Sequence, residues 1–461
     1  MNTVDVVIIG AGPAGMAAAS QAADFGASVV LLDEQCGPGG QIYRSITGID
    51  PQREKILGKD YSKGRALAGA LQHDNIRYTG RVTVWRVDGD GTVTYSKGEK
   101  STRIKGRQII IATGALERPV PLPGWTLPGV ITAGAAQILL KSTGLVADNA
   151  VLVGSGPLLY LLAAQMIAAG TAPAAMIETQ SLKSHLSACA HLGGAIRGWR
   201  MLAKGVRLLG EIRRAGVPRY RAAQAIRIAG TEKSKTVSFR SGGKDRSVAC
   251  TTVLLHQGVV PNTQISRSLG LDHDWNAAQR CFHPRTDQWG ETTNSIFNIA
   301  GDGAGIAGAS AAEYAGRLAA CNVAFKLGLI VKSRRDELAA PIFKQLASER
   351  AARPFLDTLY MPPEEILRPA DDTLVCRCEE VRAGDIRRYA RIGCVGPNQT
   401  KAYGRCGMGP CQGRYCGATV TEILAAENEL PPDEIGSYRI RSPLKPVTLQ
   451  ELASLCDTTA D

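Results

Sequence analysis

The N-terminal residues carry the pattern of a dinucleotide-binding βα unit. An apolar run, Val4–Ile9, leads directly into the glycine turn GAGPAG at residues 10–15, and an Ala-rich helix follows. Gly10 allows the tight turn, Gly12 lets the backbone approach a pyrophosphate, and Gly15 lets the helix pack closely on the strand. The start of that helix supplies amide hydrogens and a partial positive charge to phosphates. The pattern therefore predicts a parallel α/β sheet with a nucleotide at its edge.

An acidic residue and two later strands complete this predicted site. A second apolar strand ends at Asp33, eighteen residues after Gly15, where a ribose diol needs an acceptor. The strands QIIIAT and SIFNIAGD, at 108–113 and 295–302, bring their carboxyl ends to the same edge. Asp302 is thus placed to bind a cofactor hydroxyl, although Asp is also a common N-cap for the helix that follows. The residues expected here are Gly10, Gly12, Pro13, Ala14, Gly15, Asp33, Glu34, Thr113, Gly114, Gly301 and Asp302.

A second unit of the same kind begins at residue 150. The short strand Ala150–Val153 leads into Gly154 and Gly156, a long apolar helix follows, and the next strand ends at Glu178. Leu159 stands where the third glycine of the motif should be, so we expect the helix to be pushed outward and the crevice narrowed. A second nucleotide-type domain is therefore predicted, with Gly154 and Gly156 at its turn, but NAD(P) is not expected to bind it.

The order of these motifs predicts the division of the chain. The first glycine turn and the strand that ends in Gly301 and Asp302 belong to one sheet, so the second unit must be inserted between them. We expect a discontinuous first nucleotide-binding domain at 1–140 and 285–330, an inserted domain at 141–284, a linker at 331–370 and a last domain at 371–461.

Five cysteines in the last domain form two tight groups. Cys376 and Cys378 are followed by Cys406, Cys411 and Cys416 in a Gly-rich segment. Such clustering suggests metal ligation, and four thiolates suffice for a 2Fe–2S cluster. We favour Cys376, Cys378, Cys411 and Cys416 as ligands, with Cys406 outside the shell. Cys406 and Cys411 have the same spacing, however, and four thiolates also suit structural zinc.

Several classes of function are disfavoured. No CxxC motif lies within residues 150–290, so the thiol relay of a disulfide reductase is not expected. The net charge of +12 fits a solvated surface or attraction to phosphates or to an acidic partner, but no basic run alternates with aromatics as in nucleic-acid binding. The first apolar run becomes a glycine turn too soon for a signal peptide, and the longest one, near Leu158–Ala169, is too short to span a bilayer. We expect a soluble, cytoplasmic protein.

Four segments together resemble one family from end to end. They are GAGPAG with LLDEQCGPGGQIYR, then ATGALERPVPLPGWTLPGV, then VCRCEE, and finally GRCGMGPCQGRYC. The chain is similar to the A or alpha subunit of opine oxidases and of D-hydroxyproline and related amino-acid dehydrogenases, and to the B subunit of hydrogen cyanide synthase. The alpha subunit of heterotetrameric sarcosine oxidase is a more distant relative. The C-terminal part resembles bacterioferritin-associated ferredoxin.

The resemblance implies an α/β flavoprotein with two dinucleotide-binding domains, similar to glutathione reductase, and a small C-terminal 2Fe–2S domain. It adds Gly40 and Gln41 to the first site, which would hold FAD or another adenine nucleotide. A separate D-amino-acid-oxidase-like FAD subunit would oxidise the C–N bond of the substrate, and this chain would carry electrons onward without a catalytic residue of its own. The resemblance also allows for FMN at a subunit interface, a small ferredoxin-like subunit, and membrane association through partners. No transmembrane segment and no nucleic-acid partner are expected.

Two other functions stay open at this point. A self-sufficient NAD(P)H-dependent flavin and iron–sulfur oxidoreductase would use the same motifs, and a non-catalytic iron–sulfur protein would use only the cysteines. Hydrogen cyanide production from glycine is a special case of the first interpretation.

Overall fold

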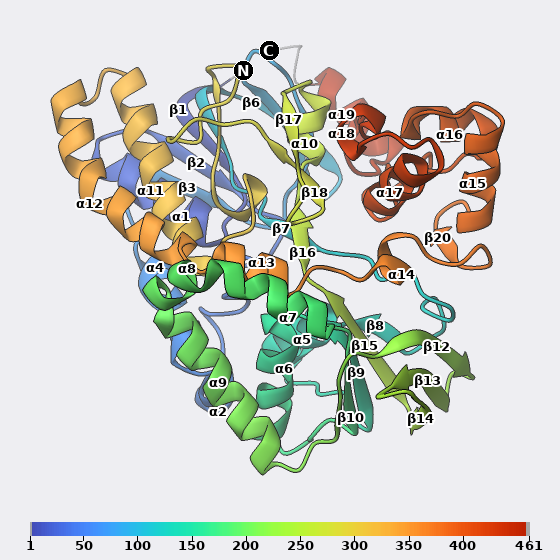
Figure 1. Cartoon of the computed structure of the whole chain (residues 1–461). Helices are drawn as coiled ribbons and strands as arrows, with labels where there is room; N and C mark the ends of the chain where they lie inside the picture. The colour runs from blue at the N-terminus through green and yellow to red at the C-terminus, as the bar shows by residue number, and fades with distance from the viewer. Residues whose placement is uncertain (1, 458–461) are drawn as a thin grey trace.

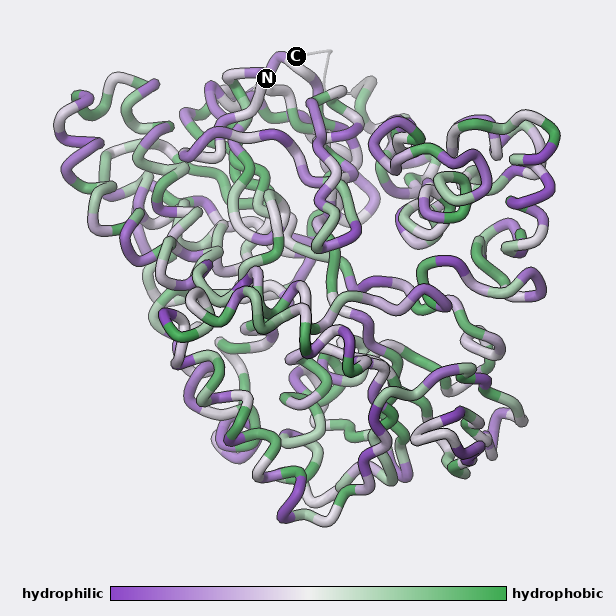
Figure 2. Tube along the Cα trace, in the orientation of Figure 1, coloured by the Kyte–Doolittle hydropathy of each residue, from purple (hydrophilic) through white to green (hydrophobic). Residues whose placement is uncertain are grey.

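The computed structural model describes residues 2–457. Figure 1 shows two α/β units, one above the other, with a mainly helical C-terminal module beside the upper one. Figure 2 shows apolar residues concentrated along the central strands and hydrophilic residues frequent on the outer helices. Among residues 2–457, no helix combines the length and the apolar character needed to cross a bilayer.

The first unit is built on a seven-stranded sheet whose central strands are parallel and are buried over their last four residues. β1 pairs in parallel with β2 and with β6, and β19 pairs in parallel with β6, so that Phe297 lies opposite Ile109. Because β19 follows the whole second unit in sequence, the sheet is assembled from two separate parts of the chain. In spatial order its strands are β3 (Ile76–Thr79), β2 (Val29–Leu32), β1 (Asn2–Ile9), β6 (Lys100–Ile111), β5 (Thr92–Lys97) and β4 (Thr83–Val87), with β19 (Phe297–Ile299) beside β6.

Two helices pack closely against each other in this unit. α1 (Pro13–Asp24) follows the first glycine turn, and α11 (Ala309–Lys326) follows β19. A Cβ at Gly316 would lie 2.1 Å from the carbonyl oxygen of Ala14, so α11 can approach α1 this closely only with a glycine at that position. Shorter helices on the way to β3 are α2 (Pro51–Leu57), α3 (Lys59–Ser62) and α4 (Gly64–Gly69).

The second unit contains an all-parallel five-stranded sheet and a separate antiparallel one. The parallel sheet already includes β8, so the second unit begins before residue 141, where the sequence had placed its start. In spatial order its strands are β11 (Arg219–Tyr220), β10 (Ala175–Glu178), β9 (Ala150–Ser155), β15 (Thr252–Gln257) and β8 (Val130–Thr132). The other elements are α5 (Ala133–Thr143), α6 (Pro157–Ala168) and the three antiparallel strands β12 (Gln224–Gly230), β13 (Lys235–Ser241) and β14 (Lys244–Cys250).

The chain crosses between the two units twice, and the crossings lie side by side. β7 (Ala115–Glu117) leaves the first unit and pairs antiparallel with β16 (Val259–Pro261), which returns to it. The amide of Arg118 also donates to the carbonyl of Gly258 at 3.0 Å. After β16 come α10 (Gln264–Ser268) and the hairpin of β17 (His273–Asn276) and β18 (Cys281–Pro284).

The segment expected as a linker, 331–370, is in fact largely helical. It forms α12 (Lys332–Arg350), α13 (Arg353–Leu359) and α14 (Glu364–Leu367). The charged residues that suggested a linker instead begin a long helix that packs on α11. Phe343 of this helix meets the ring of Trp289, which precedes β19, edge to face at 5.0 Å. α13 in turn packs on α7 (Leu182–Ala188) and α8 (Leu192–Arg197), which precede α9 (Trp199–Arg214).

The C-terminal module shares its apolar core with the first unit. Buried residues of α17, such as Val420 and Ile423, belong to the same contiguous cluster as Val7 and Ile109 of the sheet. The last helix lies against β6, where the amide of Ser101 donates to the Ser454 hydroxyl at 2.8 Å. The elements of the module are β20 (Leu374–Cys376), β21 (Val381–Arg382), α15 (Ala383–Arg391), α16 (Pro397–Gly404), α17 (Gly417–Glu427), α18 (Pro432–Ile435) and α19 (Leu449–Asp457).

The contact between α1 and α11 gives a stability prediction. Gly316→Ala should lower the free energy of unfolding by about 1–3 kcal/mol, because the added methyl overlaps the Ala14 carbonyl and the two helices must separate. Gly205→Ala in α9 is the matched control: its Cβ meets nothing within 4 Å, so stability should stay unchanged or rise by up to about 1 kcal/mol. Chemical denaturation measures both, and equal effects would contradict the close packing.

Candidate nucleotide and cysteine sites

The first glycine turn has the backbone that an approaching phosphate requires. Gly10 has φ +105°, and a Cβ there would lie 2.4 Å from the carbonyl oxygen of Ala112. A Cβ at Gly15 would lie 1.8 Å from the carbonyl oxygen of Gly10, so the turn and α1 close tightly on β6. Gly12 precedes Pro13 at the start of α1, which has no side-chain cap and no acidic residue in its first turn. The amides at the helix start are therefore not occupied by a carboxylate of the helix itself.

A second glycine-rich loop is held against this turn. The amide of Gly39 donates to the carbonyl of Ala11 at 2.8 Å. Gly40 has φ +58°, and a Cβ there would lie 2.7 Å from the Cα of Gly12. Gln41 is exposed, and its carbonyl accepts a hydrogen bond at 2.9 Å from Lys141, a buried lysine of α5. The structure thus brings Gly40 and Gln41 beside the first turn.

Asp33 lies at the end of β2, where the sequence placed it, but its carboxylate binds the main chain. The amide of Ala11 donates to Oδ2 at 2.5 Å, and the amide of Gln35 donates to Oδ1 at 2.7 Å. Burial raises the pKa of this carboxyl, while the two amides act against that rise. Asp33 therefore stabilises the glycine turn, and its role toward a ribose remains a prediction. Its neighbour Glu34 forms an ion pair with Lys445 of the C-terminal module.

The other predicted residues of this site lie at the same edge. Gly301 has φ +77°, and a Cβ there would lie 2.8 Å from the Cβ of Ala14, so the turn after β19 packs directly on α1. Asp302 accepts hydrogen bonds from the amides of Ala307 and Gly308 at 2.9 and 3.0 Å, just ahead of α11. This is close to the capping role considered from the sequence. Thr113 and Gly114 contact Asn262 at the crossing between the units, through hydrogen bonds of 3.4 and 2.9 Å.

The second glycine turn has a similar backbone geometry, but side chains of the protein already occupy the space around it. Gly154 and Gly156 both have positive φ, and Leu159 is completely buried in the core. The carboxylate of Glu178 is bound by Arg219 at 2.7 and 3.0 Å and is nearly inaccessible. The ring nitrogen Nε2 of His256 lies 3.1 Å from the position of a Cβ at residue 156. The acceptor that would bind a ribose is thus already paired, and a side chain lies against the turn.

The cysteines of the C-terminal module converge. The sulfur atoms of Cys376, Cys406 and Cys416 all lie within 4.8 Å of one another, and all three residues are buried. Hydrogen bonds from the Cys406 and Cys416 thiols, and then from backbone amides, lower the pKa of Cys376 to about 2. Cys378 and Cys411 contact each other, because the amide and the thiol of Cys411 both reach the Cys378 sulfur. The sulfur of Cys406 lies inside this group, and its place outside the coordination shell stays a prediction.

The glycine-rich loop that contains Cys406, Cys411 and Cys416 packs closely around the ring of Tyr438. A Cβ at Gly407 or at Gly413 would lie 2.4 or 2.2 Å from ring atoms of Tyr438. The Tyr438 hydroxyl lies 3.0 Å from the Thr400 hydroxyl, which also donates to the carbonyl of Cys406 at 3.3 Å. These glycines are therefore needed to seat the loop on a buried ring, a role that Gly spacing alone could not reveal.

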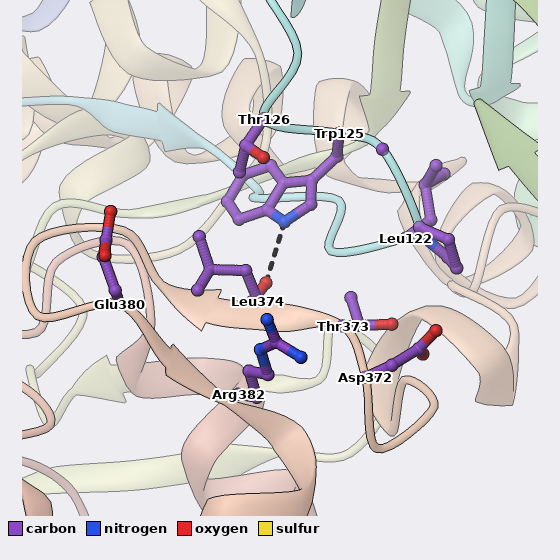
Figure 3. Close-up of a pocket in the computed structure, with 10 residues that line it drawn as sticks. Leu122, Trp125, Thr126, Asp372, Thr373, Leu374, Glu380 and Arg382 are labelled. Carbon is purple, nitrogen blue, oxygen red and sulfur yellow. Dashed lines mark hydrogen bonds between the residues drawn. The ribbon is translucent and has the colours of Figure 1, made fainter. Parts of the chain in front are cut away.

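The strand that carries Cys376 is bound to the crossover region by a tryptophan. The indole nitrogen of Trp125 donates to the carbonyl of Leu374 at 2.8 Å, and the guanidinium of Arg377 lies 5.3 Å from the centre of the indole ring. Figure 3 shows the hydrogen bond between Trp125 and Leu374. Both residues line a cavity of about 340 Å³, together with Glu380 and Arg382 of the C-terminal module. The segment LPGW therefore contacts the strand that ends at Cys376.

A buried ion pair makes the second attachment. Both carboxylate oxygens of Glu422, on α17, accept hydrogen bonds from the guanidinium of Arg280, and the bond from Nε to Oε1 is 2.7 Å long. The Glu422 side chain is only 3% exposed. Arg118 fixes this region from the other side, because it donates to the carbonyls of Gln279 and Arg280 at 2.5 and 3.1 Å. The helix that begins immediately after Cys416 is thus locked to the segment that returns to the first unit.

Comparisons with known proteins agree with this architecture. The chain matches the pyridine nucleotide-disulphide oxidoreductase family over residues 4–316 and the sarcosine oxidase A3 domain over residues 371–455. The A subunit of opine oxidase from Rhizobium meliloti is 44% identical over 464 residues, which cover 98% of this chain and 88% of the relative. Hydrogen cyanide synthase subunit HcnB of Pseudomonas aeruginosa is 30% identical over 475 residues, with 97% and 98% covered. L-proline dehydrogenase from P. horikoshii shares the fold, with a TM-score of 0.71 over 98% of this chain and 79% of its own, at 19% identity.

The fold and the family match define the class: the chain is an oxidoreductase of the pyridine nucleotide-disulphide oxidoreductase type, a family that implies a flavin cofactor. Within that class it belongs to the family formed by the A subunits of opine oxidases. The resemblance to opine oxidase A subunits and to the B subunit of hydrogen cyanide synthase, and the enzyme class expected from the sequence, are confirmed.

Gly12 allows a direct test of the first site. Gly12→Ala should weaken nucleotide binding by about tenfold or more without unfolding the apoprotein, because the new methyl occupies the space that a pyrophosphate must approach. Gly12 has an ordinary φ of −75°, and its Cβ would lie 4.0 Å from the nearest atom, so the protein itself tolerates alanine. Gly48→Ala, in open space, serves as the control. Flavin retained after gel filtration and the apoprotein melting temperature give the two readouts; undiminished binding would show that no phosphate approaches Gly12.

Proposed function

We propose that this chain is the electron-transferring A subunit of a multi-subunit FAD-dependent dehydrogenase or oxidase that acts on the C–N bond of an opine or a related amino acid. The observation that carries the proposal is the attachment of a cysteine group to a nucleotide-binding unit through Trp125 and the Arg280–Glu422 pair. Relatives that match almost the whole chain are named subunits of opine oxidase, which supports a hetero-oligomer and a substrate of that class.

The first site fits FAD. Its glycine turn and the uncapped start of α1 can receive a pyrophosphate, while Gly40 and the turn at Gly301 and Asp302 lie against it. When bound, the flavin supplies the capacity to accept an electron pair and release electrons singly. The chain's own residues position it: Asp33 holds the turn through two amides, and Asp302 holds the loop ahead of α11.

The cysteine group fits a 2Fe–2S cluster. In such a cluster each iron takes two protein thiolates. Of the proposed ligands, Cys376 and Cys416 lie in the buried group of three sulfurs that also includes Cys406, and Cys378 and Cys411 contact each other. Amides of Gly407 and Glu379 point at the Cys376 sulfur and would stabilise a thiolate there. Cys378 is exposed and Cys411 is half-buried, so a cluster held here would lie near the surface, within reach of a partner.

The relatives named as opine oxidase A subunits support a division of labour between subunits. In this proposal a D-amino-acid-oxidase-like subunit binds and oxidises the substrate, and this chain carries the electrons onward. An NAD(P)H-dependent reductase acting alone is the second candidate, but the paired Glu178 and the His256 side chain beside Gly156 disfavour it.

Reconstitution tests the proposal. The chain purified alone should be yellow-brown and inactive on opines and D-hydroxyproline, and dye-linked dehydrogenase activity should return only when the oxidase-like subunit is added. The control is anaerobic NADH added to the chain alone, which should leave the flavin oxidised. Rapid bleaching by NADH would instead support the self-sufficient reductase, and amino-acid oxidation without a partner would place the substrate pocket on this chain.

The choice of ligands can be decided with single cysteine variants. Cys378→Ala and Cys411→Ala should lose iron and the visible absorption of the cluster, because each removes one thiolate of a pair. Cys406→Ala is the matched control: it deletes a buried thiol of the same loop and should retain iron, with a changed reduction potential. Iron content and electron paramagnetic resonance of the reduced protein measure both; iron lost from Cys406→Ala but kept by Cys411→Ala would reverse the assignment.

A further inference from the structure

The helices α7, α8 and α9 expose an unusual number of large apolar side chains. Ile196 is 67% exposed and Trp199 is 61% exposed. The 182–207 face, as we call it, also includes basic side chains that are exposed on the same helices. Its apolar members are Leu182, Leu186, Leu192, Ile196, Trp199 and Val206.

The inner side of these helices is packed with small residues instead. α7 and α8 lie across α13 (Figure 1), and Ala188 and Ala195 are fully buried there. A Cβ at Gly194 would lie 2.4 Å from the carbonyl oxygen of Ala351, so this contact depends on the absence of a side chain. An ordinary amphipathic helix buries its large apolar residues and exposes polar ones. Here the small residues face the protein and the large ones face outward.

The outward apolar residues recur at helical spacing. Leu182 and Leu186 are four residues apart in α7, as are Leu192 and Ile196 in α8. In α9, Trp199 and Val206 are seven residues apart and share one face, while Leu208 and Ile212 are buried against the protein from the opposite side. Each of the three helices thus exposes an apolar stripe on its outer side and buries other residues on its inner side.

The unpaired charge of the segment is basic. Residues 182–210 contain five Lys and Arg residues and no Asp or Glu. Lys204 is paired with Asp60 at 2.7 Å and Arg207 with Glu211 at 3.5 Å, whereas Lys183, Arg197 and Arg200 form no ion pair with the described residues. Three arginines directly follow exposed apolar residues, in the pairs Ile196–Arg197, Trp199–Arg200 and Val206–Arg207. Such alternation lets the long arginine stem lie along an apolar layer while its guanidinium reaches a polar one. A protein interface would need an acidic partner for each of these charges as it was desolvated.

We propose that the 182–207 face is a peripheral docking surface for an anionic lipid bilayer. The apolar stripes would enter the boundary between headgroups and acyl chains, and the unpaired Lys183, Arg197 and Arg200 would attract the negative headgroups. The surface is made by this chain's own helices, so the docking depends neither on a partner protein nor on the proposed electron-transfer function.

Vesicle binding by the purified full-length chain tests the proposal. It should sediment with vesicles of equal parts phosphatidylcholine and phosphatidylglycerol, bind phosphatidylcholine vesicles weakly, and be released as ionic strength rises. The double variant Ile196→Asp with Trp199→Asp should bind the mixed vesicles more weakly by about tenfold or more, because two apolar side chains no longer enter the bilayer. Both residues are exposed, so the variant should keep the wild-type melting temperature.

Val331→Asp is the matched control, since Val331 is 68% exposed but stands at the start of α12, outside the face. It should bind vesicles like the wild type. Equal loss in the control variant, or no binding of the wild type to anionic vesicles, would overturn the proposal. If the wild type ignores vesicles while the double variant loses a partner protein that the wild type retains, the face is a protein interface and lipid docking is refuted.

Discussion

The buried ion pair between Arg280 and Glu422 joins the C-terminal cysteine module to the segment that leads back to the first nucleotide-binding unit. Glu422 lies six residues after Cys416 on the helix that leaves the cysteine loop, and Arg280 lies on the stretch that leads back to β19. Burying a carboxylate is costly unless it is paired and hydrogen-bonded. Moving either side chain away would therefore leave a buried charge unpaired and destabilise the contact. Arg118, which holds the main chain at Gln279 and Arg280, and Trp125, which holds the main chain at Leu374, come from one segment of the crossover. The cysteine module is therefore fixed to the crossover between the two units, and its apolar core is continuous with that of the unit that contains the first glycine turn.

The two glycine turns share one motif but differ in whether side chains of the protein occupy the space beside them. Both have glycines with positive φ and lead into buried helices. At the first, the neighbouring loop also consists of glycine, and the start of α1 is free of side-chain caps. At the second, the acidic residue is neutralised by Arg219, and His256, itself bound to Glu117 at 2.6 Å, lies against Gly156. The second unit thus has the fold of a nucleotide domain, and it also carries the crossover and helices α7–α9.

Local patterns predicted the parts of this structure that depend on local physics. The strand, turn and helix at residues 2–24 and the repeat near residue 150 follow from burial on both faces of a parallel strand and from glycine geometry. The convergence of two cysteine groups could also be predicted from their clustering. Long-range partners could not: Tyr438, Trp125 and the Arg280–Glu422 pair meet residues far away in sequence. The same limitation explains the position of Cys406, which spacing could not decide, and the helices of 332–367, whose charges and prolines resembled a linker.

The proposed electron path requires a flavin and an iron–sulfur cluster in the same chain. Metal and acid-labile sulfide analysis of the protein isolated without oxygen, together with its flavin content, measures both. We expect about two irons and two sulfides for each flavin. Stoichiometric zinc without sulfide, or the absence of any metal from protein that retains its flavin, would contradict it.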